Sequence, residues 1–187
     1  MLRVLNASTC KNARVPAAPL ANLRISPAQP SDVPLILSFI RKLAEYEKLS
    51  HEVVTDENTL QRSLFTGNAA AEVLLAYVAE EPVGFAVYFR NFSTFAGRPG
   101  LYLEDVFVEP AHRGRGIGTA ILAHLARLAK ERGFGRLNWA VLDWNRPAVD
   151  FYRRMGAVLL DDWRICWLSG AALDRLASTI NGQERGS

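Results

Sequence analysis

The chain has 187 residues, of which 49% are hydrophobic and 22% charged, a composition typical of a globular protein with one sizeable core. It contains no run of about eighteen uncharged apolar residues, so we expect no membrane span. The three histidines lack ligand spacing, which argues against a bound catalytic metal. Its two cysteines give no indication of a disulfide and favour the cytoplasm.

The net charge of +3 comes from the N-terminal end of the chain. Residues 1–31 contain four basic side chains and no acidic one, which leaves 18 basic against 19 acidic side chains elsewhere. A basic surface for nucleic acid is therefore not expected. We expect residues 1–22 to be a flexible extension, although their composition is also faintly typical of an organelle transit peptide. Residues 182–187 are expected to be a short tail.

We expect one domain over residues 23–181. Its first half should contain a short strand, two helices and then a run of strands. A helix capped by Ser31 should end near Leu49, and a helix capped by Thr55 should end near Phe65. The expected strands are 23–26, 73–80, 83–92 and 101–109, with the second and third joined as a hairpin.

In the second half, predicted helices and strands alternate. They are helix 116–132, strand 136–141, helix 145–154, strand 158–168 and a last helix that starts at Ser169. Consecutive strands followed by alternating helices and strands indicate an α/β fold. We expect a mixed, mostly antiparallel sheet flanked by helices in a single domain.

A glycine-rich segment after the strand at 101–109 carries the clearest functional signal. Gly114, Gly116 and Gly118 lead into a helix, where unpaired backbone N–H groups attract anions and the missing Cβ lets a phosphate approach. A nucleotide P-loop is excluded because its lysine is absent. A dinucleotide site is excluded because the glycine spacing differs and Asn138 stands where an acid is required. We therefore expect another phosphorylated cofactor.

The segment Arg113–Thr119 has the pattern R-x-x-G-x-G, and Asn145–Ala157 contains Asn followed by F-Y-x-x-x-G-A. Together they resemble the GNAT superfamily of N-acetyltransferases. Tyr102–Asp105 and Leu43–Glu47 are similar to the diamine (spermidine/spermine) N-acetyltransferase branch and its thialysine-acetylating relatives. The resemblance extends from about Leu23 to Trp167. It implies a GNAT-like fold and direct transfer of an acetyl group from acetyl-CoA to a primary amine.

The resemblance also implies which residues hold acetyl-CoA. The diphosphate is expected on the glycine-rich segment, and the pantetheine arm beside the preceding strand and Asn145. The expected cofactor residues are Val106, Phe107, Val108, Arg113, Gly114, Arg115, Gly116, Ile117, Gly118, Thr119 and Asn145. Asn145 is also a suitable helix N-cap, and both roles are compatible.

Amine acetylation needs a group that accepts a proton from the ammonium and another that protonates the departing thiolate. The resemblance implies Glu104, acting through water, and Tyr152 in these two roles. Because neighbouring strand residues point to opposite faces, Asp105 would replace Glu104 if the register differed by one residue. Without the resemblance, an ion pair would explain Glu104 and core packing would explain Tyr152.

The resemblance places a small cationic amine among eight residues. They are Tyr46, Glu47, Glu104, Asp105, Asn138, Trp139, Ala140 and Asp161. The turn that contains Asp161 is shorter than in the branch, which leaves the length of the acceptor open. Three functions therefore remain: acetylation of a small di- or polyamine, acetylation of a protein N-terminus or lysine, and acyl-CoA binding without catalysis. Members of the branch are typically homodimers, so we also expect a homodimer. The residues themselves lead us to expect no metal, no nucleic acid and no membrane partner.

Overall fold

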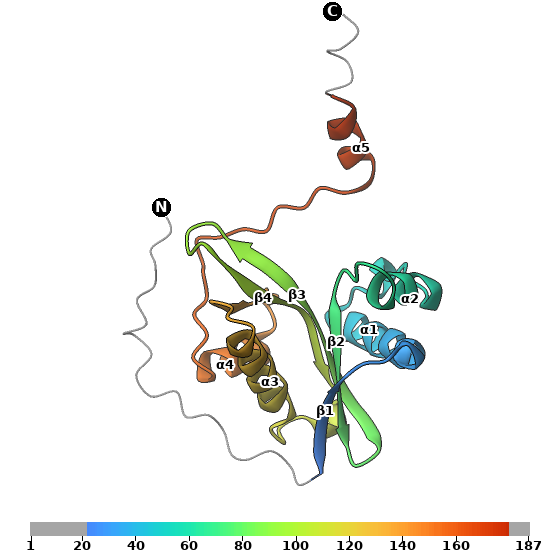
Figure 1. Ribbon diagram of the computed structural model, residues 1–187, viewed down its shortest axis with the longest axis vertical. Coiled ribbons are helices and arrows are strands. Elements are labelled where there is room, and N and C mark those ends of the chain that lie inside the picture. Colours follow the sequence, from blue (N-terminus) through green and yellow to red (C-terminus); the bar gives the residue numbers. More distant parts are fainter. Residues whose placement is uncertain (1–21, 180–187) are drawn as a thin grey trace, which may run out of the picture. The chain divides into compact units, whose positions relative to one another are not determined.

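The computed structural model describes residues 22–179, which divide at Gly156 into two units. In the first unit, five strands form one sheet in the order β1-β2-β3-β4-β5. They are β1 (Leu23–Pro27), β2 (Glu72–Val78), β3 (Glu81–Ser93), β4 (Arg98–Val108) and β5 (Leu137–Asn138). All neighbours pair antiparallel except β4 and β5, which are parallel. The predicted mixed, mostly antiparallel sheet is confirmed (Figure 1).

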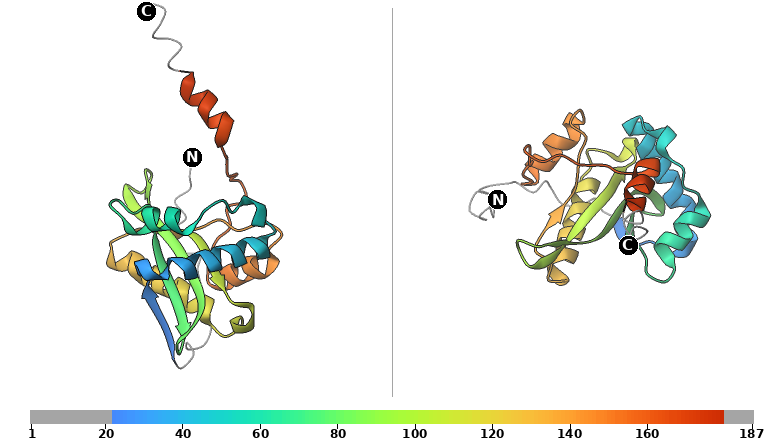
Figure 2. Two further views of the ribbon diagram at one scale, coloured as in Figure 1. Left: turned by 90° about the vertical axis from the view of Figure 1, so that its right-hand side faces the viewer. Right: turned by 90° about the horizontal axis from the view of Figure 1, so that it is seen from above.

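Helices cover both faces of this sheet. The first pair, α1 (Val33–Glu47) and α2 (Glu57–Phe65), lies on one face, and α3 (Ile117–Glu131) and α4 (Arg146–Arg154) lie on the other (Figures 1 and 2). Short 3-10 turns precede or follow them at η2 (Pro30–Asp32), η3 (Ser50–Glu52) and η4 (Pro110–His112). The predicted helices are thus present, and the sheet is the middle layer of three.

The ends of two helices differ from the prediction by one residue. Ser31 does not cap α1, because it lies inside the preceding 3-10 turn and Asp32 is the N-cap. The prediction for Thr55 is also wrong, since Asp56 caps α2 and accepts a hydrogen bond from the backbone N–H of Thr59 at 2.7 Å. In both cases an aspartate, an equally good cap, stands next to the residue chosen from the sequence.

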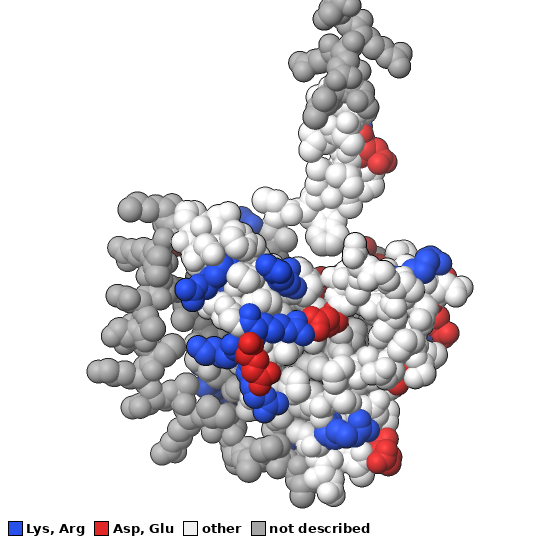
Figure 3. All heavy atoms as spheres, in the orientation of Figure 1, with Lys and Arg blue, Asp and Glu red and all other residues white. Residues whose placement is uncertain are grey.

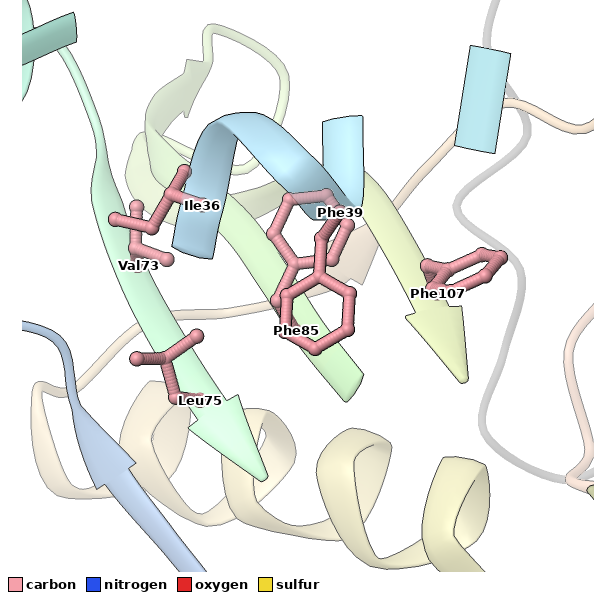
Figure 4. Packing of buried hydrophobic residues seen from close by; sticks show 6 residues of the cluster. All are labelled: Ile36, Phe39, Val73, Leu75, Phe85 and Phe107. Carbon is pink, nitrogen blue, oxygen red and sulfur yellow. The ribbon is translucent and has the colours of Figure 1, made fainter. Parts of the chain in front are cut away.

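A cluster of apolar side chains fixes α1 against the sheet (Figure 4). Phe39 on α1 stacks on Phe85 of β3, with ring centres 5.4 Å apart, and its ring lies 6.0 Å from that of Phe107 on β4. All three side chains are at most 4% exposed. The other buried members of the cluster are Ile36, Val73 and Leu75. This packing sets the position of the C-terminal end of α1 relative to β4.

Two strand predictions differ from the structure: the strand predicted at 136–141 was too long, and the strand predicted at 158–168 was wrong. Only Leu137–Asn138 of the predicted strand 136–141 joins the sheet. The segment 158–168 in the second unit is not a strand, because a strand requires a hydrogen-bonded neighbour and no described strand pairs with it. The second unit contains α5 (Gly170–Ser178), which starts after Ser169 as predicted.

The predicted extension at residues 1–22 lies almost wholly outside the described residues, and the predicted tail at 182–187 lies entirely outside them. Within residues 22–179, no helix combines the length and the apolar character needed to cross a bilayer.

Candidate active site

Strand β4 has two irregularities that open the sheet. Val87 of β3 pairs with Asp105 and Tyr88 pairs with Leu103, so Glu104 is the extra residue of a β-bulge. On the other edge, β5 pairs with β4 only at Leu101 and Tyr102. The stretch 103–108 of β4 therefore has no described strand partner on its β5 side, and its main-chain groups can bond to a ligand there.

A cavity of about 550 Å³ lies along this open edge. The end of α1, the glycine-rich segment, the residues after β5 and the start of α4 also contribute to it. Most of the residues predicted from the sequence line it. They are Tyr46, Glu47, Glu104, Asp105, Val106, Phe107, Val108, Arg113, Gly114, Gly116, Ile117, Gly118, Thr119, Trp139, Ala140, Asn145 and Tyr152.

The glycine-rich segment presents free backbone donors to this cavity. Gly114 and Gly116 have φ values of 74° and 86°, which residues with a Cβ rarely adopt. Gly116 is the N-cap of α3, where no side chain caps the helix. Within residues 22–179, nothing accepts a hydrogen bond from the backbone N–H groups of 116–119. Free donors at a helix start, beside Arg113, fit an anion such as a diphosphate.

Three carboxylates, those of Glu47, Glu104 and Asp105, also line the cavity. Burial raises the pKa of Asp105 from 3.8 to about 6, and the charges of Glu104 and Glu47 raise it further in that direction. Burial also raises the pKa of Glu47. Both shifts mean that the carboxylates lack compensating positive charge. A cation entering the cavity would supply it.

Tyr152 lies on α4 and is 8% exposed. Its ring packs against those of Trp139 and Phe151, with centres 5.0 and 5.3 Å away. Burial, and next the charge of Glu47, raises the pKa of its hydroxyl to about 12. The phenol is therefore protonated at neutral pH and available as a proton donor.

Asn145 caps α4, as predicted, because its Oδ1 accepts a hydrogen bond from the backbone N–H of Ala148 at 3.3 Å. The same oxygen accepts a hydrogen bond from the hydroxyl of Tyr46 at 3.1 Å. Tyr46 therefore links the end of α1 to the start of α4.

Three predicted residues are not among those that line the cavity. A guanidinium nitrogen of Arg115 lies 3.3 Å from Nδ1 of His112. Asn138 accepts a hydrogen bond from Nδ2 of Asn91 at 3.1 Å. Asp161 belongs to the second unit. The roles assigned to these three residues stay predictions.

The sequence analysis did not identify Val141, Leu142 and Phe151, which also line the cavity. Val141 is the last residue of the predicted strand and Leu142 follows it, and their apolar character was the available signal. Phe151 packs close to the glycine-rich helix start, because a Cβ on Gly118 would lie 3.4 Å from its ring. Among residues 22–179, no group of three or more His, Cys, Asp or Glu side chains is arranged to hold a metal ion.

The face drawn in Figure 3 gathers several basic side chains, with acidic ones beside them. Two of the ion pairs on α3 and its C-terminal end are Arg127 with Glu131 and Arg132 with Glu72. In the second pair, Glu72 also accepts a hydrogen bond from the hydroxyl of Tyr88 at 3.2 Å. These arginines are thus already paired within the protein.

An open strand edge that leads to a helix start with free N–H groups, with a buried phenol nearby, is the arrangement that a transferase for a phosphorylated acyl carrier requires. Comparison with known families agrees with this class. The pattern of the acetyltransferase (GNAT) family matches residues 39–157. The chain belongs to the GNAT family and is an acetyltransferase, a class of enzyme that uses acetyl-CoA.

Several relatives match most of the chain. A thialysine N-epsilon-acetyltransferase of Mus musculus is 38% identical over 169 residues, covering 84% of this chain and 99% of the relative. An L-ornithine N5-acetyltransferase of Arabidopsis thaliana is 30% identical, with 82% and 87% of the two chains covered. An integron cassette protein from the mobile metagenome of V. cholerae has the same fold, with a TM-score of 0.72, 24% identity and coverage of 85% and 99%.

The substitution Asp105→Asn should change how stability depends on pH. The folded-state pKa of about 6 lies above 3.8, so Asp105 contributes stability that is full below about pH 4 and is lost as the pH rises through about 6. Asparagine never ionises. The variant should therefore gain up to about 3 kcal/mol of unfolding free energy relative to the wild type between pH 4 and pH 8.

Urea unfolding at both pH values measures this difference, with the exposed Asp150→Asn as the matched control. A variant whose stability follows the wild type at every pH would show that Asp105 is not held in a desolvated, acidic environment.

Proposed function

We propose that this acetyltransferase acetylates a primary amine of a small di- or polyamine or of a similar aminoalkyl compound. The observation that carries the proposal is the convergence of Glu47, Glu104 and Asp105 on the cavity that also contains Tyr152. Uncompensated carboxylates favour a compact cationic acceptor. The names of several relatives also refer to small amines: they include a thialysine acetyltransferase, an ornithine acetyltransferase and a spermidine/spermine N(1)-acetyltransferase-like protein.

The acetyl-CoA site of the proposal consists of the residues that line the other half of the cavity. Acetyl-CoA supplies the activated acetyl group as a thioester. The N–H groups of Gly114–Thr119 and the side chain of Arg113 would bind its diphosphate. The free main-chain edge at Val106–Val108 would bind the pantetheine arm in the manner of an added strand. Asn145 would donate to the arm near the thioester.

Glu104 is the proposed proton acceptor. An ammonium with a pKa near 10.4 must lose a proton before it can attack, which costs roughly 4.6 kcal/mol at pH 7. The bulge turns Glu104 toward the cavity while leaving it exposed, so a water molecule can relay the proton to its carboxylate. Asp105 lines the same cavity and remains the alternative acceptor.

Tyr152 is the proposed acid for the departing thiolate. Its pKa of about 12 exceeds the usual 8.5 of a thiol. With that pKa, transfer of the Tyr152 proton to the thiolate would be uphill. Part of that high value is due to the charge of Glu47. An ammonium bound beside Glu47 would offset this charge and lower the pKa of Tyr152, so that substrate binding itself improves the acid.

An assay of acetyl-CoA turnover with several amines tests the proposed function. Spermidine, putrescine, ornithine, thialysine, lysine and a peptide with a free N-terminus are compared at equal concentration. We expect kcat/KM for the best small cationic amine to exceed that for the peptide by at least about tenfold, or about 1.4 kcal/mol. A preference for the peptide would favour protein acetylation, and binding of acetyl-CoA without turnover of any amine would favour a non-catalytic module.

The substitution Tyr152→Phe removes the proposed acid while keeping the ring that packs against Trp139 and Phe151. We expect turnover to fall by about 100-fold or more, as is typical for loss of a general acid, with acetyl-CoA affinity within about twofold. Steady-state kinetics and calorimetry measure the two quantities. The control is Tyr102→Phe on β4, and unchanged turnover in Tyr152→Phe would refute the assignment.

We also propose a homodimer in the cytoplasm, supported by the second unit and by its cysteine. Ile165 and Trp167 are 74% and 85% exposed, although both are large and apolar, and Cys166 is an exposed free thiol. Exposed apolar groups of this kind are typical of interaction sites.

The mass in solution should therefore be about 41 kDa, twice the 20.7 kDa of one chain. Light scattering after size-exclusion chromatography measures it. The double substitution Ile165→Ser and Trp167→Ser should yield monomers, because the apolar contact is lost, whereas a wild-type monomer would contradict the proposal.

A further inference from the structure

Tyr46 contacts both ends of the proposed acetyl-CoA site from the C-terminal end of α1. Its hydroxyl donates a hydrogen bond to Oδ1 of Asn145 at 3.1 Å. The guanidinium carbon of Arg113 lies 4.6 Å from the centre of its ring. Asn145 begins α4 and Arg113 begins the glycine-rich segment. One side chain thus contacts both the residue proposed for the pantetheine arm and the residue proposed for the diphosphate.

The hydrogen bond from Tyr46 determines what Asn145 can offer to a ligand. A carboxamide oxygen has two lone pairs, and here both are engaged, one by Tyr46 and the other by the N–H of Ala148. The Nδ2 group therefore remains as a donor. No residue of the described chain accepts from it, although Asn145 is only 8% exposed. Nδ2 is not among the buried polar atoms of the described chain that lack a hydrogen-bond partner, so it is accessible to solvent and free to donate to a ligand, and an amide carbonyl of a pantetheine arm would accept from it.

The ring of Tyr46 also restricts the guanidinium of Arg113. Nε of Arg113 donates to the backbone oxygen of Val108 at 2.9 Å, and the guanidinium carbon lies 5.5 Å from the ring centre of Phe107. Arg113 has no acidic partner among residues 22–179. An arginine held by two aromatic rings and one backbone oxygen, and free of a carboxylate, is oriented in advance for an anion.

We propose that Tyr46 is a positioning residue for acetyl-CoA and not a contact of the amine. Its hydroxyl orients the Asn145 amide so that Nδ2 faces the ligand, and its ring orients the Arg113 guanidinium. This inference rests on the proposed function, because it requires acetyl-CoA in this cavity. It replaces the role in amine binding that the sequence resemblance implied for Tyr46.

Two substitutions separate the two contacts. Tyr46→Phe removes the hydroxyl and keeps the ring, whereas Tyr46→Leu removes both. Calorimetry with two probes reads the ends of the site separately: coenzyme A, which carries the pantetheine arm, and 3′-phospho-ADP, which carries the diphosphate without the arm. Each variant is first checked by thermal unfolding.

For Tyr46→Phe we expect the affinity for coenzyme A to fall by about 2- to 10-fold and that for 3′-phospho-ADP to stay within about twofold, since only the bond to Asn145 is lost. Tyr46→Leu should in addition weaken 3′-phospho-ADP by about 2- to 5-fold. The KM for the best amine should stay within about twofold in both. Tyr77→Phe is the matched control, because its ring also lies under an arginine, 4.1 Å from Cζ of Arg24, away from this cavity.

Three results would overturn the inference alone. They are a raised amine KM with unchanged coenzyme A affinity in Tyr46→Phe, equal weakening of both probes in that variant, and unchanged 3′-phospho-ADP affinity in Tyr46→Leu. If the wild type bound no coenzyme A, the proposed function would fail together with this inference. Wild-type binding with an unaffected Tyr46→Phe variant would overturn only the role of Tyr46.

Discussion

The parting of β4 from β5 after Tyr102 is the constraint on which the site depends. Had the two strands remained paired along 103–108, the main-chain groups there would be used within the sheet and would be closed to any ligand. The bulge at Glu104 acts on the same stretch from the other edge, because it breaks the alternation of side chains. Two adjacent carboxylates, Glu104 and Asp105, can therefore both line one cavity.

The same geometry has a cost in stability. Asp105 and Glu47 are drawn out of water next to one another and to Glu104, and no arginine or lysine is paired with them among residues 22–179. Elsewhere in the first unit, the partly buried carboxylate of Glu72 has an arginine partner. Arg132 lowers the pKa of Glu72 by a direct hydrogen bond. The contrast between the compensated carboxylate of Glu72 and the uncompensated ones in the cavity supports the proposed cationic acceptor.

The sequence was sufficient for features that local chemistry determines. The glycine-rich helix start, the Asn145 cap and the apolar stripe of α1 all follow from short patterns, and the structure contains each of them. The bulge was not predictable, because the registers of β3 and β4 depend on both strands together. The wrong strand prediction at 158–168 has the same cause, because pairing depends on a second segment of the chain. Its valine, isoleucine and tryptophan residues have strand character, but a ladder also needs a partner strand, which residue composition cannot supply.

Glu47 connects the two halves of the proposed chemistry. Its charge raises the pKa of Asp105 and that of Tyr152, so the alternative proton acceptor and the proposed proton donor, on different elements, respond to one carboxylate at the end of α1. Before the amine binds, both groups hold their protons more tightly than usual. A bound ammonium would offset the charge of Glu47 and lower both pKa values together. Asp105, already largely ionised at neutral pH with a pKa of about 6, would then be ionised more fully, and Tyr152 would be a better acid. Tyr46, the neighbouring residue on α1, contacts the residues proposed to hold acetyl-CoA. Glu47, at the end of α1, would then couple amine binding to readiness for proton transfer, while Tyr46, the residue before it, orients the groups proposed to bind acetyl-CoA.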